Sequence, residues 1–136
     1  MLGQLESRQR VVIADMEAGV GTITRMGEGS FDHVLLVSEP TIKATEVAKR
    51  ARQIIDEAKL GPIVVVANKV RTPEDLDTIQ SELGRVDIVI PEDIHVVMAD
   101  QNGLSPFDAY PDAPAVKAVL GLVRRLTSTE SVPVAG

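Results

Sequence analysis

The sequence predicts an α/β fold in three layers, in which a parallel sheet carries helices on both faces. Four short apolar runs alternate with stretches of helical periodicity along the chain. Each run is apolar without interruption, which is typical of strands that are covered on both faces. Strands that alternate with helices of this length indicate βαβ units with right-handed crossovers. The predicted strands are residues 11–14, 34–37, 63–67 and 88–90.

Start and stop signals bound the predicted helices. Thr41 and Thr72 each precede a stretch of helical periodicity and can cap it, and Thr72 is followed by proline and two acidic residues. Glycine or proline follows the first two stretches and ends them. Arginines near the end of the third stretch suit the negative end of a helix dipole. The predicted helices are residues 41–59, 72–83 and 112–126.

Length and composition predict one domain and exclude several kinds of site. The chain has 136 residues, which fits a single domain over residues 1–126 with a flexible tail at 127–136. With 20 acidic and 14 basic residues, its formal charge of −6 gives no electrostatic support for nucleic-acid binding. The absence of cysteine excludes disulfides, zinc–thiolate sites and thiol catalysis, and two histidines argue against a multi-histidine metal site.

The sequence carries no membrane signal. No apolar run approaches the roughly 20 residues that span a bilayer, and the first residues lack the apolar core of a signal peptide. We therefore expect a cytoplasmic protein that neither enters a membrane nor binds nucleic acid.

Candidate site residues follow the predicted strands. In open parallel sheets, ligands bind at the carboxyl ends of the strands. The informative segments are therefore those that follow each apolar run, namely residues 15–21, 38–40, 68–71 and 91–93.

Five segments together resemble one family. They read DMEAG, VSEPT, VANKV, IVIPED and DQNGLSPFDA, in this order, at residues 15–19, 37–41, 65–70, 88–93 and 100–109. This set is similar to segments of the MinD/ParA-type nucleotide-binding ATPases. The branch it resembles most is that of the accessory ATPases that help to insert nickel into carbon monoxide dehydrogenase. The resemblance extends from about residue 10 to residue 126.

One motif of that family is absent from the chain. A phosphate-binding loop needs a lysine directly after a glycine, so that backbone amides and the ammonium group surround the phosphates. None of the five lysines follows a glycine. The chain thus resembles the C-terminal part of an incomplete P-loop NTPase-like domain. We expect no ATP hydrolysis by this chain alone, and tight binding of neither ATP nor Mg²⁺.

The resemblance also implies a gap in the sheet. In this family the strand that precedes the phosphate-binding loop lies between the strands that match residues 11–14 and 34–37. Unpaired backbone groups left at such a gap would be costly if buried. We expect the sheet to change its register, or the missing strand to come from a second copy or from a separate N-terminal polypeptide.

The resemblance implies roles for six residues. Asp15 would reach Mg²⁺ through water, and Gly19 would sense the γ-phosphate as part of a switch. Asn68 would bind the adenine base, with Lys69 beside it, and Pro91 and Glu92 would frame the base pocket. From the residues alone, each also suits an ordinary strand end or turn, and Glu17 suits a solvated loop acid or a second acid near the metal.

Other polar residues favour plainer interpretations. His33 and His95 have no partner at metal-ligand spacing and are interpreted as buried or edge histidines. Thr22 and Arg25 depart from the pattern that the family carries after its switch, which weakens any detailed transfer of that switch. A solvated helix face or a docking face fits the basic cluster of Lys43, Lys49, Arg50 and Arg52.

Two main functions remain open from the sequence. The first is the C-terminal part of an ATP-binding ATPase for metalloenzyme maturation, which acts as a homodimer or with a missing N-terminal half and serves a metalloenzyme client. The second is a non-catalytic interaction or regulatory module on a nucleotide-binding fold. A receiver-like signalling domain is a third reading, but the chain lacks the early acidic pair of such domains.

Overall fold

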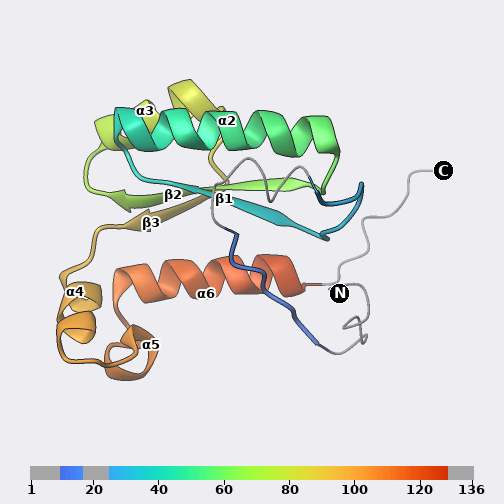
Figure 1. Cartoon of the computed structure of the whole chain (residues 1–136). Coiled ribbons are helices and arrows are strands. Elements are labelled where there is room, and N and C mark those ends of the chain that lie inside the picture. Colours follow the sequence, from blue (N-terminus) through green and yellow to red (C-terminus); the bar gives the residue numbers. More distant parts are fainter. Residues whose placement is uncertain (1–9, 17–24, 129–136) are drawn as a thin grey trace.

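A computed structural model describes residues 10–16 and 25–128. Its parallel sheet has the order β1-β2-β3, formed by β1 (Val34–Ser38), β2 (Ile63–Val70) and β3 (Ile88–Pro91). Helices α2 (Ile42–Ala58) and α3 (Pro73–Leu83) lie on one face of the sheet, and α6 (Pro114–Thr127) lies on the other (Figure 1). Two short helices, α4 (Ile94–Gln101) and α5 (Pro106–Ala109), connect β3 to α6. The predicted three-layer α/β fold with parallel strands is confirmed.

The predicted caps form as hydrogen bonds. The side-chain hydroxyl of Thr41 accepts a hydrogen bond from the amide of Ala44 at 3.2 Å, and that of Thr72 accepts one from the amide of Asp75 at 3.2 Å. Each bond satisfies one of the amide groups that a helix start leaves without an intrahelical partner. Both caps directly follow a strand end, so they fix where the chain turns from the sheet into a helix.

The turn between α2 and β2 packs closely against the segment that precedes β1. Lys59 ends α2 in the left-handed conformation, with φ of 51°. The amide of Phe31 donates to the carbonyl of Leu60 at 3.0 Å. A Cβ atom at Gly61 would collide with the backbone carbonyl of Phe31, so this turn accepts only glycine.

The two faces of the sheet bury cores of different size. On the α2–α3 face, the buried apolar cluster is extensive and includes Leu36, Ala48, Ile55, Leu60, Val65, Ala67, Ile79 and Leu83. On the α6 face, the buried cluster contains Val64, Val66 and Leu122, with Ile88, Ile90 and Leu126 packed against it. Helix α6 is therefore held by a small number of apolar contacts.

Helix α6 leaves part of β1 bare. Leu35 and Val37 are 40% and 53% exposed, whereas their neighbours Leu36 and Ser38 are buried under α2. In the parallel register, Leu35 pairs with Val64 and therefore lies on the same face as α6. No described residue pairs with the other edge of β1. We call this open edge, with Leu35 and Val37, the β1 surface.

The strand predicted at residues 11–14 does not form. Residues 10–16 have no regular secondary structure, and Val11, Val12 and Ile13 are exposed. The outer edge of β1 is open, but residues 10–16 pair neither with it nor with any other described strand. The sheet therefore keeps the order and direction of its remaining strands, and no change of register fills the gap.

The segment before α6 is also more ordered than expected. No helix was predicted between residues 84 and 111, whereas α4 and α5 occupy much of residues 94–109. The last predicted helix is confirmed as α6, and residues 129–136 of the predicted tail lie outside the described residues. Among the described residues, none of the helices is long and apolar enough to cross a bilayer.

Candidate functional site

The carboxyl ends of the three strands bring the predicted site residues to one edge of the sheet. All three strands are parallel, so the residues at their carboxyl ends lie along the same edge. These residues are Glu39 after β1, Asn68 and Lys69 near the end of β2, and Glu92 after β3. Pro91 is the last residue of β3. The position predicted for Asn68, Lys69, Pro91 and Glu92 is therefore where the fold places them.

An irregularity in β2 directs Lys69 toward β1. The β2–β3 register shifts between Ala67 and Val70, and Lys69 has a left-handed φ of 56°. Such bulges are common next to functional sites, where they redirect a side chain. Here the Nζ of Lys69 lies 2.8 Å from Oε1 of Glu39, and this hydrogen bond and the charge of Glu39 raise the pKa of Lys69.

A second charged group joins β2 to β3. The Nε of Arg71 lies 3.8 Å from Oε2 of Glu92 and 3.4 Å from Oδ2 of Asp75. The amide of Arg71 also donates to Oδ2 of Asp75 at 2.9 Å, and this bond lowers the pKa of Asp75. The carboxylate of Asp75 thus holds the turn from β2 into α3 through the amide of Arg71 and also faces the guanidinium group of Arg71.

Pairing of these charges limits what the edge can bind. The cations Lys69 and Arg71 both face carboxylates, so neither presents an uncompensated positive charge to an anionic ligand. A triphosphate needs such charge together with a glycine-rich loop, and the chain has no such loop. Lys69 and Arg71 are therefore not free to neutralise a triphosphate.

A groove runs from this edge along β1 and α2. It has a volume of about 480 Å³, and its walls are mostly aliphatic. Polar groups enter it at the strand-end side, where Asn68 offers both a donor and an acceptor. An apolar cleft with a few polar groups at one end is the usual form of a small-molecule site. Its lining residues are Leu36, Val37, Ser38, Glu39, Thr41, Lys43, Ala44, Val47, Ala48, Ala51 and Asn68.

Asp93 is the residue whose role the sequence did not show. Its nearly buried carboxylate accepts hydrogen bonds from the amide of His95 at 3.0 Å, the Nδ1 of His95 at 2.8 Å and the amide of Ala115 at 3.0 Å. The bonds from Ala115 and His95 lower the pKa of Asp93. Asp93 therefore caps α4 and also anchors the first turn of α6. The sequence feature that could have predicted this cap is an aspartate directly before an apolar run.

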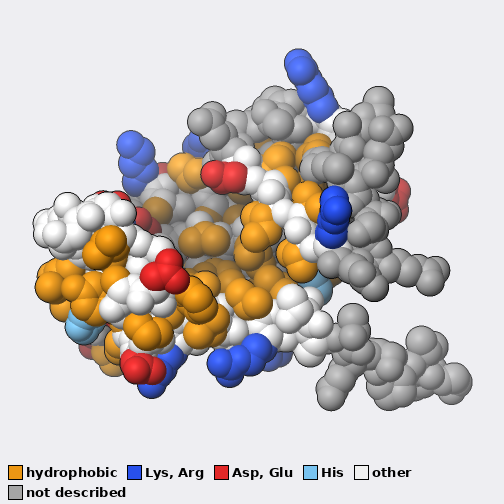
Figure 2. All heavy atoms as spheres, turned by 90° about the horizontal axis from the view of Figure 1, so that it is seen from below, with side chains coloured by type: hydrophobic (Ala, Val, Ile, Leu, Met, Phe, Trp, Pro, Cys, Tyr) orange, Lys and Arg blue, Asp and Glu red, His pale blue; other side chains and the backbone are white. Residues whose placement is uncertain are grey.

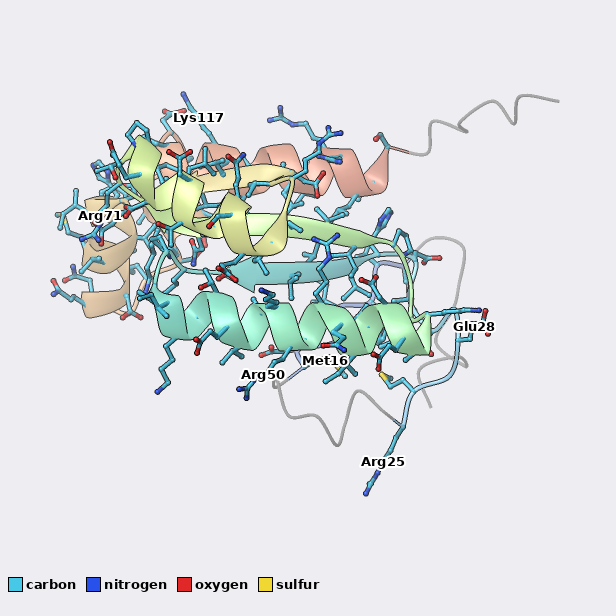
Figure 3. The ribbon with its side chains drawn as sticks, turned by 90° about the horizontal axis from the view of Figure 1, so that it is seen from above. Met16, Arg25, Glu28, Arg50, Arg71 and Lys117 are labelled. Carbon is cyan, nitrogen blue, oxygen red and sulfur yellow. The ribbon has the colours of Figure 1, made fainter. Side chains whose placement is uncertain are left out.

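Of the two predicted switch residues, Asp15 alone lies among the described residues. Asp15 is exposed in the irregular segment before Met16, and Met16 packs against the core beside α2 (Figure 3). Gly19, with Glu17 and Thr22, lies outside the described residues. Arg25 points away from the rest of the molecule (Figure 3). The roles of Asp15 and Gly19 therefore stay predictions.

The histidines and acids form no metal centre within residues 10–16 and 25–128. No group of three or more histidine or acidic side chains there could hold a metal ion. His33 is exposed, and His95 binds Asp93 and lies 4.9 Å from the ring of Tyr110. The latter contacts are those of a structural histidine.

Comparison with known proteins agrees with the fold and the motifs. No family model matches the chain. The carbon monoxide dehydrogenase accessory protein CooC of Rhodospirillum rubrum is 29% identical over 132 residues, which is 94% of this chain and 50% of CooC. An uncharacterised ATP-binding protein of Methanocaldococcus jannaschii is 35% identical over 100 residues, or 71% of this chain and 39% of that protein.

A solved structure shows the same arrangement of elements. The MinD cell division protein of Aquifex aeolicus matches with a TM-score of 0.60 and 23% identity, over 75% of this chain and 46% of MinD. This likeness supports the fold. The chain spans about half the length of the curated relatives it matches. The resemblance is thereby confirmed: the chain is related to the MinD/ParA-type P-loop ATPases and corresponds to part of such a protein.

Proposed function

We propose that this chain is the base-binding part of an ATP-dependent MinD/ParA-type protein that assists the maturation of a metalloenzyme. In this proposal, Asn68 binds adenine at the carboxyl edge of the sheet, and Pro91 and Glu92 border the base from the end of β3. Asp15 and Gly19 form the switch, and the triphosphate and Mg²⁺ are held by a phosphate-binding loop on another polypeptide segment. The metalloenzyme link rests on the similarity to CooC, which is a carbon monoxide dehydrogenase accessory protein by name.

The β1 surface carries this proposal. An edge strand whose backbone is unpaired and whose apolar side chains are bare is a ready template for another strand. The groove that contains Asn68 opens beside the same strand. A strand added at β1 would therefore bring the loop that follows it to the carboxyl edge, next to the base-binding groove. This placement would complete a nucleotide site from two segments.

Nucleotide binding by the chain alone tests the base-binding role. We expect weak binding of adenosine by isothermal titration calorimetry, with ATP bound within roughly threefold of adenosine because Lys69 and Arg71 are already paired. Asn68→Ala should weaken adenosine binding by roughly tenfold, since it removes both a donor and an acceptor. The matched control is Gln80→Ala, at an exposed position on α3. Equal binding by both variants would contradict the proposal.

ATP hydrolysis tests the missing loop. The purified chain should show no Mg²⁺-dependent ATPase activity above a denatured blank. Turnover that Asp15→Ala abolishes would show that the chain holds a complete catalytic site and would overturn the two-segment arrangement.

A second function, the non-catalytic interaction module, is favoured by the same bare strand. In that case the β1 surface would pair with a second copy of the chain instead of a loop-bearing segment. Sedimentation equilibrium separates the two. A dimer that Val37→Asp dissociates, together with no adenosine binding, would support the module and contradict the nucleotide proposal.

A further inference from the structure

Helix α4 is apolar on several sides and yet exposed. Of its residues, Ala99 is buried, while Ile94, Val97 and Met98 are 63%, 46% and 40% exposed. Those three follow the spacing that puts residues on one helix face. A helix that is apolar all round is normally covered by other protein. Helix α4 therefore has the composition of an interface element.

The neighbouring loop and α5 extend this apolar area. Leu104 and Phe107 are both more than half exposed, and α5 contacts α4. We call Ile94, Val97, Met98, Leu104 and Phe107 the α4–α5 surface. Figure 2 shows hydrophobic side chains gathered at this end of the molecule, with acidic side chains among them. At these exposures the five side chains present on the order of 500 Å² of apolar area, a size at which an exposed patch is often functional.

The same segment carries the negative charge of the protein. Residues 86–116 contain six acidic residues and no lysine or arginine, which equals the formal charge of −6 of the whole chain. Asp100 lies on α4, Asp108 on α5 and Asp112 just before α6. Across residues 10–16 and 25–128, none of these three forms a salt bridge. The apolar surface is thus bordered by uncompensated carboxylates.

The position of the α4–α5 surface separates it from the β1 surface. Helix α4 follows β3, and β3 lies at the opposite edge of the sheet from β1 (Figure 1). A strand that pairs with β1 would therefore leave α4 and α5 uncovered. A separate partner is therefore needed to cover the α4–α5 surface.

The carboxylates beside the α4–α5 surface indicate which kind of partner binds there. Two copies joined face to face would place the carboxylates of Asp100 and Asp108 near those of the second copy, which is unfavourable. A partner with basic residues around apolar anchors would satisfy both features. We propose that the α4–α5 surface docks an amphipathic helix of a partner protein, with aliphatic or aromatic anchors flanked by lysine or arginine. This inference does not depend on nucleotide binding.

A pair of synthetic peptides tests the proposal. The first is an amphipathic helix with leucine on one face and lysine on the other, and the second carries glutamate in place of lysine. Fluorescence anisotropy should show binding of the lysine peptide, weaker at about 300 mM than at about 50 mM NaCl because salt screens the carboxylates. The glutamate peptide should bind at least roughly tenfold more weakly, because its charge repels the same carboxylates.

Variants locate the binding site. Val97→Ser with Met98→Ser should weaken binding of the lysine peptide by roughly tenfold, because the change removes two of the five apolar side chains of this surface. Asp100→Asn with Asp108→Asn should remove most of the salt dependence. Val119→Ser with Val123→Ser is the matched control, since these residues of α6 are 43% and 46% exposed but lie outside this surface, and it should change affinity by less than twofold.

Three results would overturn the proposal. The first is equal binding of the two peptides, which would leave the carboxylates without a role. The second is an unchanged affinity in the α4 double variant whose circular dichroism spectrum matches the parent protein. The third is a dimer of the chain that Met98→Ser dissociates, which would make a second copy the occupant.

Discussion

Replacing Leu122 by alanine tests how α6 is held on the sheet. Leu122 is 7% exposed and packs with Val64 and Val66 in the smaller of the two buried clusters. Leucine-to-alanine changes in cores cost about 2–5 kcal/mol, and the lower part of that range applies where the neighbours can close over the space. Because this cluster is small and borders the bare face of β1, we expect a loss of about 2–3 kcal/mol in the free energy of unfolding.

Urea unfolding followed by circular dichroism at the helix band measures this loss. The matched control is Val123→Ala on the same helix, where the side chain is 46% exposed, and a change of less than about 0.5 kcal/mol is expected. In thermal unfolding, Leu122→Ala should lower the Tm by roughly 6–10 °C for a domain of this size. Equal effects of the two substitutions would show that α6 does not pack on the sheet through Leu122 and would refute this account of the second layer.

Three further changes probe local features of the fold. Thr72→Ala removes the cap of α3 and should cost about 1 kcal/mol in urea unfolding. Gly61→Ala should destabilise the protein by about 1–3 kcal/mol because the new Cβ meets a backbone carbonyl, whereas Gly121→Ala, which meets nothing within 4 Å inside α6, should stabilise it by about 0.5–1 kcal/mol. The pKa of Asp93 is lowered below 3.8, so the stability it contributes is present above that pH and is lost as the pH falls through the folded pKa. Asp93→Asn should therefore flatten the acid side of the stability profile in urea titrations from pH 6 to pH 3.

Local signals in the sequence were sufficient for most of the fold. The caps at Thr41 and Thr72 and the Gly61–Pro62 stop are short-range features, and each appears in the structure at the expected place. The strand predicted at residues 11–14 was wrong because hydrophobicity is a local signal whereas a strand forms by pairing, and no described residue supplies the strand that lies beside this segment in the resembled family. Helix α4 was missed because its apolar residues show no helical period, which is the signal that identifies an amphipathic helix.

The sequence predicted where the candidate site lies but not which of its side chains contact one another. Parallel strands place Asn68 and Glu92 at one edge by topology alone, so their location was predictable. The pairing of Lys69 with Glu39 depends on a left-handed residue inside β2, and a lysine gives no sign of that conformation. The consequence, that Lys69 and Arg71 at the strand-end edge already face carboxylates, follows from the three-dimensional structure alone.

One short turn links the strand-end edge to the α4–α5 surface. Glu92 faces Arg71 at the edge, and the next residue, Asp93, caps α4 and binds the first turn of α6. A ligand that changes the Arg71–Glu92 pair would act on Glu92, the residue before the cap Asp93. A partner bound to α4 would act on the helix that Asp93 caps. Two sites that bias one structural element are coupled reciprocally. If both proposals hold, adenosine should bind with a different affinity when the lysine peptide is present, and Asp93→Asn should reduce that difference.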